Sequence, residues 1–211
     1  MDNKVMNNLS YGLFVLTAKG EKDNGCIINT ASQVTTSPNR IIIAVNKQNY
    51  THDLIVKSGV FNVSIIDESA NFDLFKHFGF SSGRDTDKFN NYKDCKRAEN
   101  GVLYVTTGIN SVICGKVVSS TDLGTHTLFL ADVTDGFKLN ENASATYSFY
   151  HKNIKPKPET VNPAPAESKT EENAEPIYRC TICGYIHKGE MPDDFTCPWC
   201  RHPKEDFERI Q

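Results

Sequence analysis

Four of the seven cysteines in this 211-residue chain are grouped near one end as two C-x-x-C pairs. The pairs are Cys180/Cys183 and Cys197/Cys200, and residues 184–196 separate them. A C-x-x-C turn presents two thiolates together, and two such turns supply four sulfur ligands at tetrahedral corners. The spacing therefore predicts a metal site rather than four ordinary core thiols.

The cysteine spacing alone leaves the metal open, because tetrahedral four-sulfur sites hold either Zn²⁺ or a single iron. Gly184 permits a close backbone approach, so that amide N–H groups can point at sulfur and stabilise the reduced site. Five aromatic residues can limit water at the metal: Tyr178, Tyr185, Phe195, Trp199 and Phe207. These features favour iron, and a zinc ribbon is the alternative.

The segment from Tyr178 to Ile210 resembles the short rubredoxin-like domains through its motifs CTICGY and CPWC and the later P-K and Phe. The resemblance implies one iron held by the four cysteines. Full-length rubredoxins have a longer insert between the two pairs and usually a Gly after the last Cys, where this chain has Arg201. The short insert is expected to expose the metal more.

A proline-rich segment, residues 151–176, precedes this cysteine-rich region. It mixes five prolines with Lys, Glu, Ser, Ala and Asn, and it has almost no large apolar residue. Such a composition buries too little surface to offset the entropy of ordering, so a flexible linker is predicted between residues 1–150 and 177–211. The alternative is a proline-rich strap lying over a single domain.

Charge and hydropathy exclude several classes of protein. The net charge of -3 comes with no basic stripe to neutralise phosphates, which argues against a nucleic-acid partner. No apolar run approaches the roughly 18 residues that span a bilayer. The sequence MDNKVMNNLSYG lacks the features of a signal peptide, so a cytoplasmic location without membrane contact is expected.

The first 150 residues are predicted to be mainly β, with short helices. Short β-branched and aliphatic runs separated by turn signals favour a closed antiparallel barrel. No GxGxxG or GxxxxGK[ST] loop supports a Rossmann or P-loop nucleotide site. The predicted strands are Leu13–Thr17, Arg40–Val45, Phe61–Ile66, Ser111–Val118 and Thr127–Val133, and the predicted helices are Thr51–Ser58 and Asn71–Phe78.

Three polar segments stand out among these strands. The small and amide side chains of Asn29–Thr36 leave room and donors for a flat heteroaromatic ring. Asn46–His52 combines a lysine with amides just before a helix start, which suits a phosphate. The third is the Ser/Gly/Arg stretch after the second helix. The alternative is that all three are ordinary connecting loops.

The three polar segments and one later strand segment together resemble the flavin reductase family. Their sequences are NTASQVTTSP (29–38), NKQNYTHDLI (46–55), FGFSSGRDTDKF (78–89) and GTHTLFLADV (124–133). The resemblance covers nearly all of residues 1–150 and implies a homodimeric FMN-binding split barrel. It implies isoalloxazine contacts from Asn29, Thr30, Ala31 and Ser32. It implies ribityl and phosphate contacts from Asn46, Lys47 and Thr51, and a loop closing over FMN from Ser82, Gly83 and Arg84.

The resemblance also places His126 near the reactive face of the flavin. The alternative for His126 is a hydrogen-bonded histidine on a strand. For Arg84 the alternative is a surface ion pair with Asp85 or Asp87. Cys26 and Cys114 lie in apolar strand contexts and are predicted to be small core residues.

Together, the two resemblances imply an oxidoreductase that takes hydride from NAD(P)H onto FMN and passes single electrons to the rubredoxin iron. Proteins of this architecture pass electrons onward to flavodiiron oxygen or nitric oxide reductases, so such an acceptor is expected. One alternative is a flavin or ferric reductase carrying a zinc-ribbon partner-binding module. Another is a flavin-binding redox sensor or scaffold with zinc in its second domain.

Overall fold

The computed structural model describes residues 3–156, 175–180, 185–197 and 203–210. The chain divides into two compact units, Met1–Lys155 and Pro156–Gln211. Residues 151–154, assigned to the linker from the sequence, lie in a helical turn of the first unit, where Ile154 packs against the core. Residues 157–174 of the predicted linker lie outside the described residues, so the linker itself stays a prediction.

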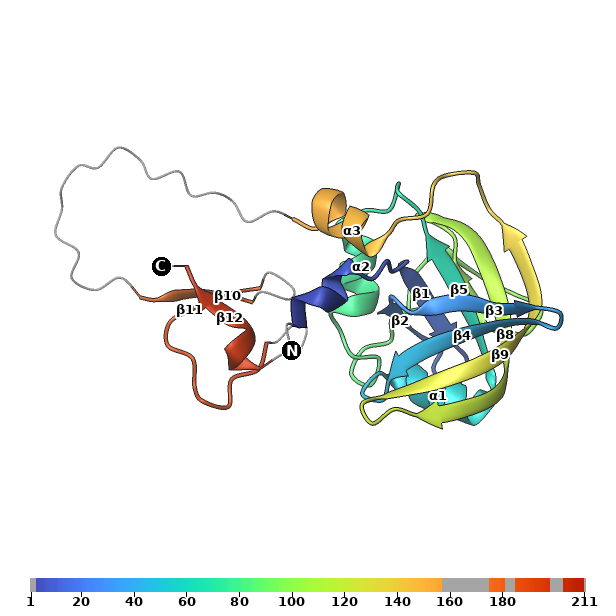
Figure 1. The fold of residues 1–211 in the computed structure, drawn as a ribbon, viewed down its shortest axis with the longest axis horizontal. Coiled ribbons are helices and arrows are strands. Elements are labelled where there is room, and N and C mark those ends of the chain that lie inside the picture. Colours follow the sequence, from blue (N-terminus) through green and yellow to red (C-terminus); the bar gives the residue numbers. More distant parts are fainter. Residues whose placement is uncertain (1–2, 157–174, 181–184, 198–202, 211) are drawn as a thin grey trace. The chain divides into compact units, whose positions relative to one another are not determined.

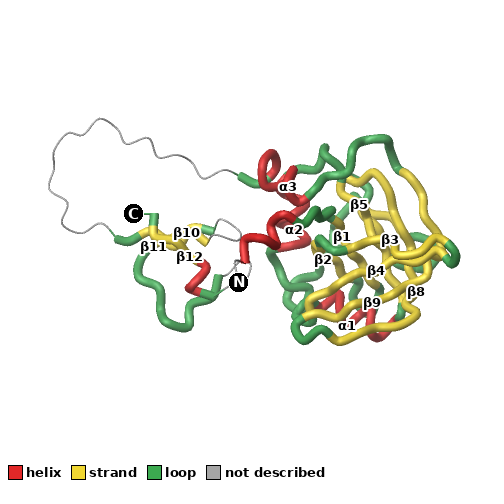
Figure 2. Tube along the Cα trace, in the orientation of Figure 1, coloured by secondary structure: helices red, strands yellow, loops and turns green. Residues whose placement is uncertain are grey.

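The first unit is built on one antiparallel seven-stranded sheet with strand order β2-β1-β5-β8-β9-β4-β3 (Figures 1 and 2). The two outermost strands, β2 (Asn24–Ile28) and β3 (Ala31–Thr36), follow each other in sequence with only Asn29 and Thr30 between them. Because so short a connection holds the two edges together, the sheet must curl on itself. The mainly β class predicted from the sequence is confirmed.

Burial of β-branched and aromatic side chains explains why these residues form strands. In β4 (Asn39–Asn46) the side chains of Ile41, Ile43 and Val45 are buried while their neighbours are less so. In β5 (Val60–Ile66) Phe61 and Val63 are fully buried. Burying each such side chain contributes about 1.5–3 kcal/mol, so the centre of the sheet supplies much of the hydrophobic stabilisation.

Two apolar clusters fill the two ends of the curled sheet. One includes Leu54 and Ile55 of α1 (Tyr50–Ser58), and the other includes Leu74, Phe75 and Phe78 of α2 (Phe72–Gly79). Figure 1 shows α1 at one end of the barrel and α2 with α3 at the other. The two predicted helices are thus confirmed, and the structure shows that they cover the ends of the barrel.

Local signals account for the helix limits. Asn71 caps α2 by accepting a 3.3 Å hydrogen bond from the Leu74 amide. After α1, Gly59 takes a left-handed conformation with φ 69° and donates to the Ile55 carbonyl at 2.8 Å. Both helices begin within one residue of the predicted positions.

The first unit also holds elements that the sequence patterns did not predict. Strand β3 lies in the polar segment Asn29–Thr36, which is absent from the predicted strands because its exposed Ser, Gln and Thr side chains give no apolar alternation. Both faces of this edge strand are largely exposed, so neither face needs a row of apolar side chains. Strand β2, η1 (Asn3–Asn8), β6 (Cys95–Arg97), β7 (Leu103–Val105), α3 (Tyr147–Phe149) and η2 (Tyr150–Ile154) were likewise not predicted. The strands predicted at Leu13–Thr17, Ser111–Val118 and Thr127–Val133 are confirmed as β1 (Phe14–Ala18), β8 (Ile109–Asp122) and β9 (His126–Lys138).

The second unit contains a three-stranded antiparallel sheet of order β11-β10-β12. Cys180 at the end of β10 and Cys197 are both fully buried and pack together with Tyr185 and Phe207. The elements of this unit are β10 (Ile177–Cys180), β11 (Ile186–Lys188), η3 (Lys204–Asp206) and β12 (Phe207–Arg209). Within the parts of the chain that the structure describes, no helix is long and apolar enough to cross a membrane.

Candidate functional site

The start of α1 gathers several of the residues predicted to bind a cofactor. Asn46 ends β4 and lies opposite His126 of β9, and its side-chain oxygen accepts from the Gln48 amide at 2.9 Å. Lys47 reaches the turn between β8 and β9, where its amine donates to Asp122 at 2.6 Å and its amide to the Thr125 carbonyl at 3.0 Å. The predicted phosphate segment and His126 therefore lie beside each other.

The predicted isoalloxazine segment runs alongside the same strand. The Thr30 carbonyl accepts from the Ala44 amide at 3.3 Å, two residues before Asn46. Ala31 and Ser32 then pair with Ile43 and Ile42 of β4. Asn29 and Ser32 are exposed, so this edge of the barrel presents polar side chains to solvent next to the α1 start.

The loop after α2 is joined to α1 by an ion pair. Arg84 donates to Asp53 of α1 at 2.7 Å, and its guanidinium lies 5.6 Å from the ring centre of Tyr50. Arg84 thus forms the surface ion pair considered from the sequence, but with Asp53 rather than with Asp85 or Asp87. Sequence reasoning missed Asp53 because its partner lies 31 positions away.

A histidine completes this charged group. His52 lies 3.2 Å from Asp53 through Nδ1 and 2.9 Å from the Thr127 hydroxyl through Nε2. Burial by itself would raise the pKa of the Asp53 carboxyl, but the hydrogen bonds from His52 and Arg84 lower it overall. The hydrogen bond from Lys47, together with the Gly124 amide, lowers the pKa of Asp122. Both acids therefore stay ionised and hold the neighbouring cations in place.

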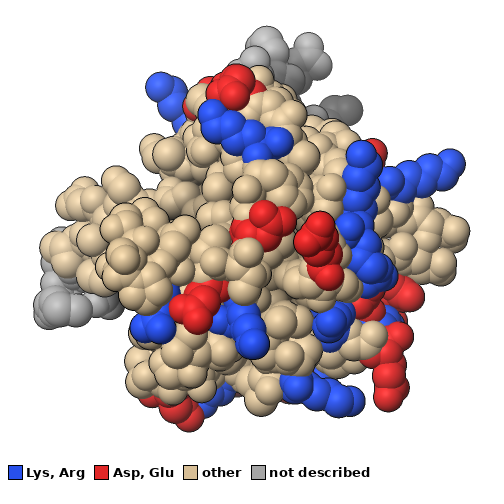
Figure 3. Space-filling model, turned by 90° about the vertical axis from the view of Figure 1, so that its right-hand side faces the viewer, with Lys and Arg blue, Asp and Glu red and all other residues tan. Residues whose placement is uncertain are grey.

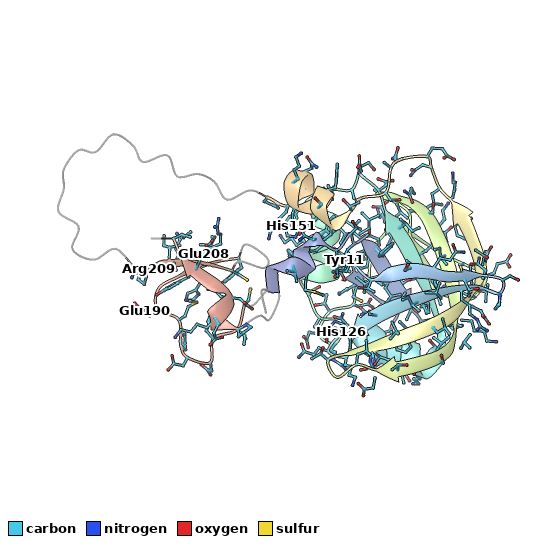
Figure 4. All side chains as sticks on the ribbon, in the orientation of Figure 1. Tyr11, His126, His151, Glu190, Glu208 and Arg209 are labelled. Carbon is cyan, nitrogen blue, oxygen red and sulfur yellow. The ribbon has the colours of Figure 1, made fainter. Side chains whose placement is uncertain are left out.

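His126 stands at the first position of β9 and is labelled in Figure 4. Its Nδ1 lies 2.9 Å from the Thr125 hydroxyl, and the ring is partly exposed. This geometry matches the hydrogen-bonded histidine on a strand, and it also leaves the ring beside Asn46 and the α1 start. The flavin-facing role of His126 stays a prediction.

Thr51 differs from the other predicted contact residues because it is fully buried. Its hydroxyl accepts a 2.8 Å hydrogen bond from the side-chain amide of Asn24 in β2. Asn24 is itself 1% exposed, and its Oδ1 is a buried polar atom without a hydrogen-bond partner. Thr51 therefore links α1 to β2 from below the surface.

Gly83 packs directly on the Asn24 side chain. A Cβ at position 83 would overlap the outer atoms of that amide, so only glycine fits against it. The phosphate-bearing end of a flavin fits here, because the start of α1 is exposed and the cations Lys47 and Arg84 lie beside it. Gly83 and the buried Asn24 amide lie next to these groups. The residues present therefore suit the cofactor implied by the sequence.

The two cations at the α1 start are paired with acids, Lys47 with Asp122 and Arg84 with Asp53. The face drawn in Figure 3 has Lys and Arg side chains intermixed with Asp and Glu. Several of the basic residues of this unit are paired, including Arg40 with Asp132 and Lys47 with Asp122. Binding at the α1 start would therefore depend on a few placed groups rather than on a general attraction.

Two of the three cysteines of the first unit belong to its core. Cys26 and Cys114 are buried, which confirms their assignment to the core. Burial raises the pKa of the Cys26 thiol and, together with Asp135, raises the pKa of Cys114 to about 11. Both thiols therefore stay protonated and unreactive at neutral pH.

In the second unit, one cysteine from each C-x-x-C pair lies in the same buried cluster. Cys180 is 1% exposed and Cys197 is fully buried, with the half-buried Tyr185 and Phe207 beside them. Cys183 and Cys200 lie outside the described residues. Bringing Cys180 and Cys197 together in an aromatic surrounding is the arrangement that a four-thiolate metal site needs.

Comparison with known proteins decides the family. Residues 6–157 match the model of the flavin reductase like domain, which is more than half of the chain. The chain belongs to this family. Residues 178–208 match the rubrerythrin, rubredoxin-like domain, so this flavin reductase family member carries a rubredoxin-like domain in the same chain. Domains of these two kinds imply a flavin and an iron.

Similar proteins agree with this two-domain organisation. The chain is 34% identical to the high molecular weight rubredoxin of Moorella thermoacetica, covering 100% of both chains. It is 35% identical to the ferric-chelate reductase (NAD(P)H) of Archaeoglobus fulgidus over 72% of this chain and 89% of that protein. Both resemblances inferred from the sequence are thereby confirmed.

Solved structures agree on the fold of the first unit. The NADH:FAD oxidoreductase of Streptomyces globisporus superposes with a TM-score of 0.63, covering 69% of this chain and 86% of that one, at 22% identity. The FMN-binding protein of Thermus thermophilus superposes with a TM-score of 0.57 at 20% identity, covering 63% of this chain and 72% of that one. At these identities the likeness concerns the fold alone.

Proposed function

We propose that this flavin reductase family member moves electrons from NAD(P)H to FMN in the first unit, then to one iron in the second unit, and finally to a separate redox protein. The observation that carries the proposal is the presence of both domains in one chain, matched end to end by a high molecular weight rubredoxin. Flavin suits this position because it accepts two electrons at once and releases them singly.

The FMN would lie along β3 with its phosphate at the start of α1. Asn29 and Ser32 would face the ring, while Lys47 and Arg84 would hold the phosphate. The carboxylates that now pair with these two cations, Asp122 and Asp53, keep the side chains extended over the site. His126 would lie at the nicotinamide side, where an imidazole can orient a bound ring or hold a proton.

The iron would be held by Cys180, Cys183, Cys197 and Cys200. Burial of the described pair beside Tyr185 and Phe207 keeps water from the sulfur atoms, which favours a stable one-electron site. The final acceptor would be a protein that docks on this small domain, and a flavodiiron oxygen or nitric oxide reductase is the proposed class. A homodimer formed through the flavin domain is proposed with it.

The decisive experiment is anaerobic stopped-flow mixing of the purified protein with NADH, following the flavin absorbance and the thiolate-to-iron bands together. We expect the flavin to bleach first and the iron bands to follow at a rate independent of protein concentration. Iron bands that never respond while the flavin turns over would refute the electron path between the units.

A second candidate function is a flavin or ferric reductase whose C-terminal domain holds zinc and binds a partner. The similarity to a ferric-chelate reductase over 72% of the chain favours it. Metal analysis of protein produced with both metals present separates the two, together with the variant Cys197→Ser. If the protein is a flavin or ferric reductase, we expect zinc in the second domain, and Cys197→Ser should oxidise NADH with ferric chelates as fast as the unmodified protein does. The electron-transfer reading expects iron, and loss of electron delivery to a protein acceptor in the variant.

A further inference from the structure

The turn that carries Arg84 is held firmly at both ends. At its start, the Ser81 hydroxyl donates to the His77 carbonyl of α2 at 3.3 Å. At its far end, the buried Lys88 amine donates to the carbonyls of Gly25 and Phe78 at 2.9 and 2.8 Å. The ends of the segment are therefore tied to β2 and α2 and cannot drift from the barrel.

The middle of the segment is a compact turn. The amides of Asp85 and Thr86 both donate to the Ser82 carbonyl, at 3.2 and 3.0 Å, and the Arg84 amide donates to the Ser82 hydroxyl at 3.2 Å. Gly83 and Arg84 are the residues inside this turn. Because the turn is internally hydrogen-bonded, whatever supports Gly83 also sets the position of Arg84.

Asn24 supports Gly83. The Asn24 amide is buried, and its hydrogen bond to Thr51 ties it to the first turn of α1. A side chain at position 83 would strike Cγ, Oδ1 and Nδ2 of Asn24 together, so the glycine is in close contact with the amide. Asn24 thus sits between the Arg84 turn and the helix start that Thr51 belongs to.

The unpartnered Oδ1 of Asn24 adds a second observation. A buried amide oxygen without a donor is costly, and a fold without a need for an amide could place a small apolar residue there. The two ends of an Asn amide are assigned by their hydrogen bonds, so exchange of Oδ1 and Nδ2 would leave an N–H unpartnered instead. With either assignment, one buried polar atom of Asn24 next to Gly83 has no hydrogen-bond partner.

We infer that Asn24 is a positioning residue for phosphate recognition: it seats Gly83 and so holds Arg84 over the start of α1, where the phosphomonoester of a flavin mononucleotide binds. This inference rests on the proposed function. It predicts that Asn24 and Gly83 matter for the phosphate end of the cofactor and little for its ring. Flavins with and without phosphate therefore separate this role from a general support of the fold.

The test compares the dissociation constants of FMN and riboflavin by fluorescence titration of full-length protein freed of flavin. For Gly83→Ala we expect FMN affinity to fall at least tenfold and riboflavin affinity to change less than threefold. Asn24→Ala is expected to weaken FMN similarly. In the double variant the alanine at position 83 has nothing to strike, so its FMN affinity should equal that of Asn24→Ala alone.

Gly79→Ala is the matched control, since a Cβ there makes only ordinary contacts with Ile27. It should bind both flavins as the unmodified protein does. Equal losses of FMN and riboflavin, or additive losses in the double variant, would overturn the inference. If Asn24→Ala does not fold, Asn24→Ser replaces it with the same expectations. If the unmodified protein binds neither flavin, the proposed function fails instead.

Discussion

Arg84 is the exposed cation best placed to meet an anion at the start of α1. It is about half exposed, pairs with Asp53 and lies over the Tyr50 ring. Charge-assisted hydrogen bonds to phosphate contribute about 1.5–3 kcal/mol. We therefore expect Arg84→Gln to weaken FMN binding about tenfold or more, measured by fluorescence titration.

Arg97→Gln provides the control for that experiment. Arg97 has similar exposure and a similar ion pair, with Asp23 at 2.8 Å, but its hydrogen-bond partners, Asp23 and the Gly101 carbonyl, are not at the start of α1. Its replacement should leave FMN affinity unchanged. An equal effect of the two substitutions would mean that general surface charge, rather than the placed guanidinium, attracts the cofactor.

Asp67 illustrates a residue whose role is entirely structural. The carboxylate is fully buried and accepts from the Ser69 amide and hydroxyl at 2.8 and 2.5 Å and from the side chains of Asn140 and Asn142. Burial alone would raise the pKa of Asp67, but these hydrogen bonds lower it overall. The carboxylate therefore ties the end of β5 to the segment after β9.

The variant Asp67→Asn should lose about 1–3 kcal/mol of unfolding free energy at pH 7, because its amide hydrogens would face the amide donors of Asn140 and Asn142. The stabilisation from a lowered pKa is complete above the ordinary carboxyl value of about 4 and is lost as the pH falls through the folded-state value. Urea unfolding should thus show the difference shrinking in acid. Asp85 is exposed, so Asp85→Asn serves as the control and should change neither the unfolding free energy at pH 7 nor its dependence on pH.

At the scale of elements, β8 contains a glycine that its partner strand requires. Gly115 lies directly opposite Phe61 of β5, whose ring covers it. A Cβ at position 115 would enter the space of that fully buried ring. The register of β5 and β8 therefore depends on having no side chain at this position.

Gly115→Ala is expected to destabilise the first unit by about 1–3 kcal/mol, because overpacking displaces Phe61. Thermal unfolding with the matched variant Gly136→Ala checks this. Gly136 lies on β9 where a Cβ would approach only the Val112 carbonyl, at 3.4 Å. A melting temperature of Gly115→Ala equal to that of Gly136→Ala would contradict the packing account.

The α1 start shows how several elements form one site. The helix itself supplies Asp53 and Tyr50, the β8–β9 turn supplies Asp122, and the loop after α2 supplies Arg84. Each pair joins parts of the chain that are far apart in sequence, 75 positions for Lys47 and Asp122. The site therefore forms only once the barrel has closed.

For the whole molecule, the proposal depends on both units being in one chain. A tether sets an effective concentration on the order of millimolar without any tight interface. We expect that cutting the chain at a protease site inserted within residues 157–174 will slow iron reduction by NADH about a hundredfold at about 10 μM protein. The rate should then rise in proportion to protein concentration.

The uncut protein with the same insertion is the control for that measurement. Its iron should be reduced at a rate independent of concentration. Equal rates before and after cleavage would mean that the two units remain associated without the chain between them, and the tether would then have no kinetic role.

The sequence by itself determined the features that depend on neighbouring residues. The two C-x-x-C pairs, the cap at Asn71 and the β-branched runs of β4 and β5 act within a few positions, so their patterns predicted the metal domain, helices and central strands. The NTASQVTT and NKQNYTH motifs led to the flavin segments through their resemblance to a family.

Tertiary structure alone decided which of these segments meet. Asn24 lies 27 positions from Thr51, and Asp53 lies 31 positions from Arg84, so no local pattern joins either pair. Strand β3 was hidden because an exposed edge strand needs no apolar alternation. Hydrogen bonds and close packing between distant residues depend on how the sheet curls, and that curvature is a property of all seven strands together.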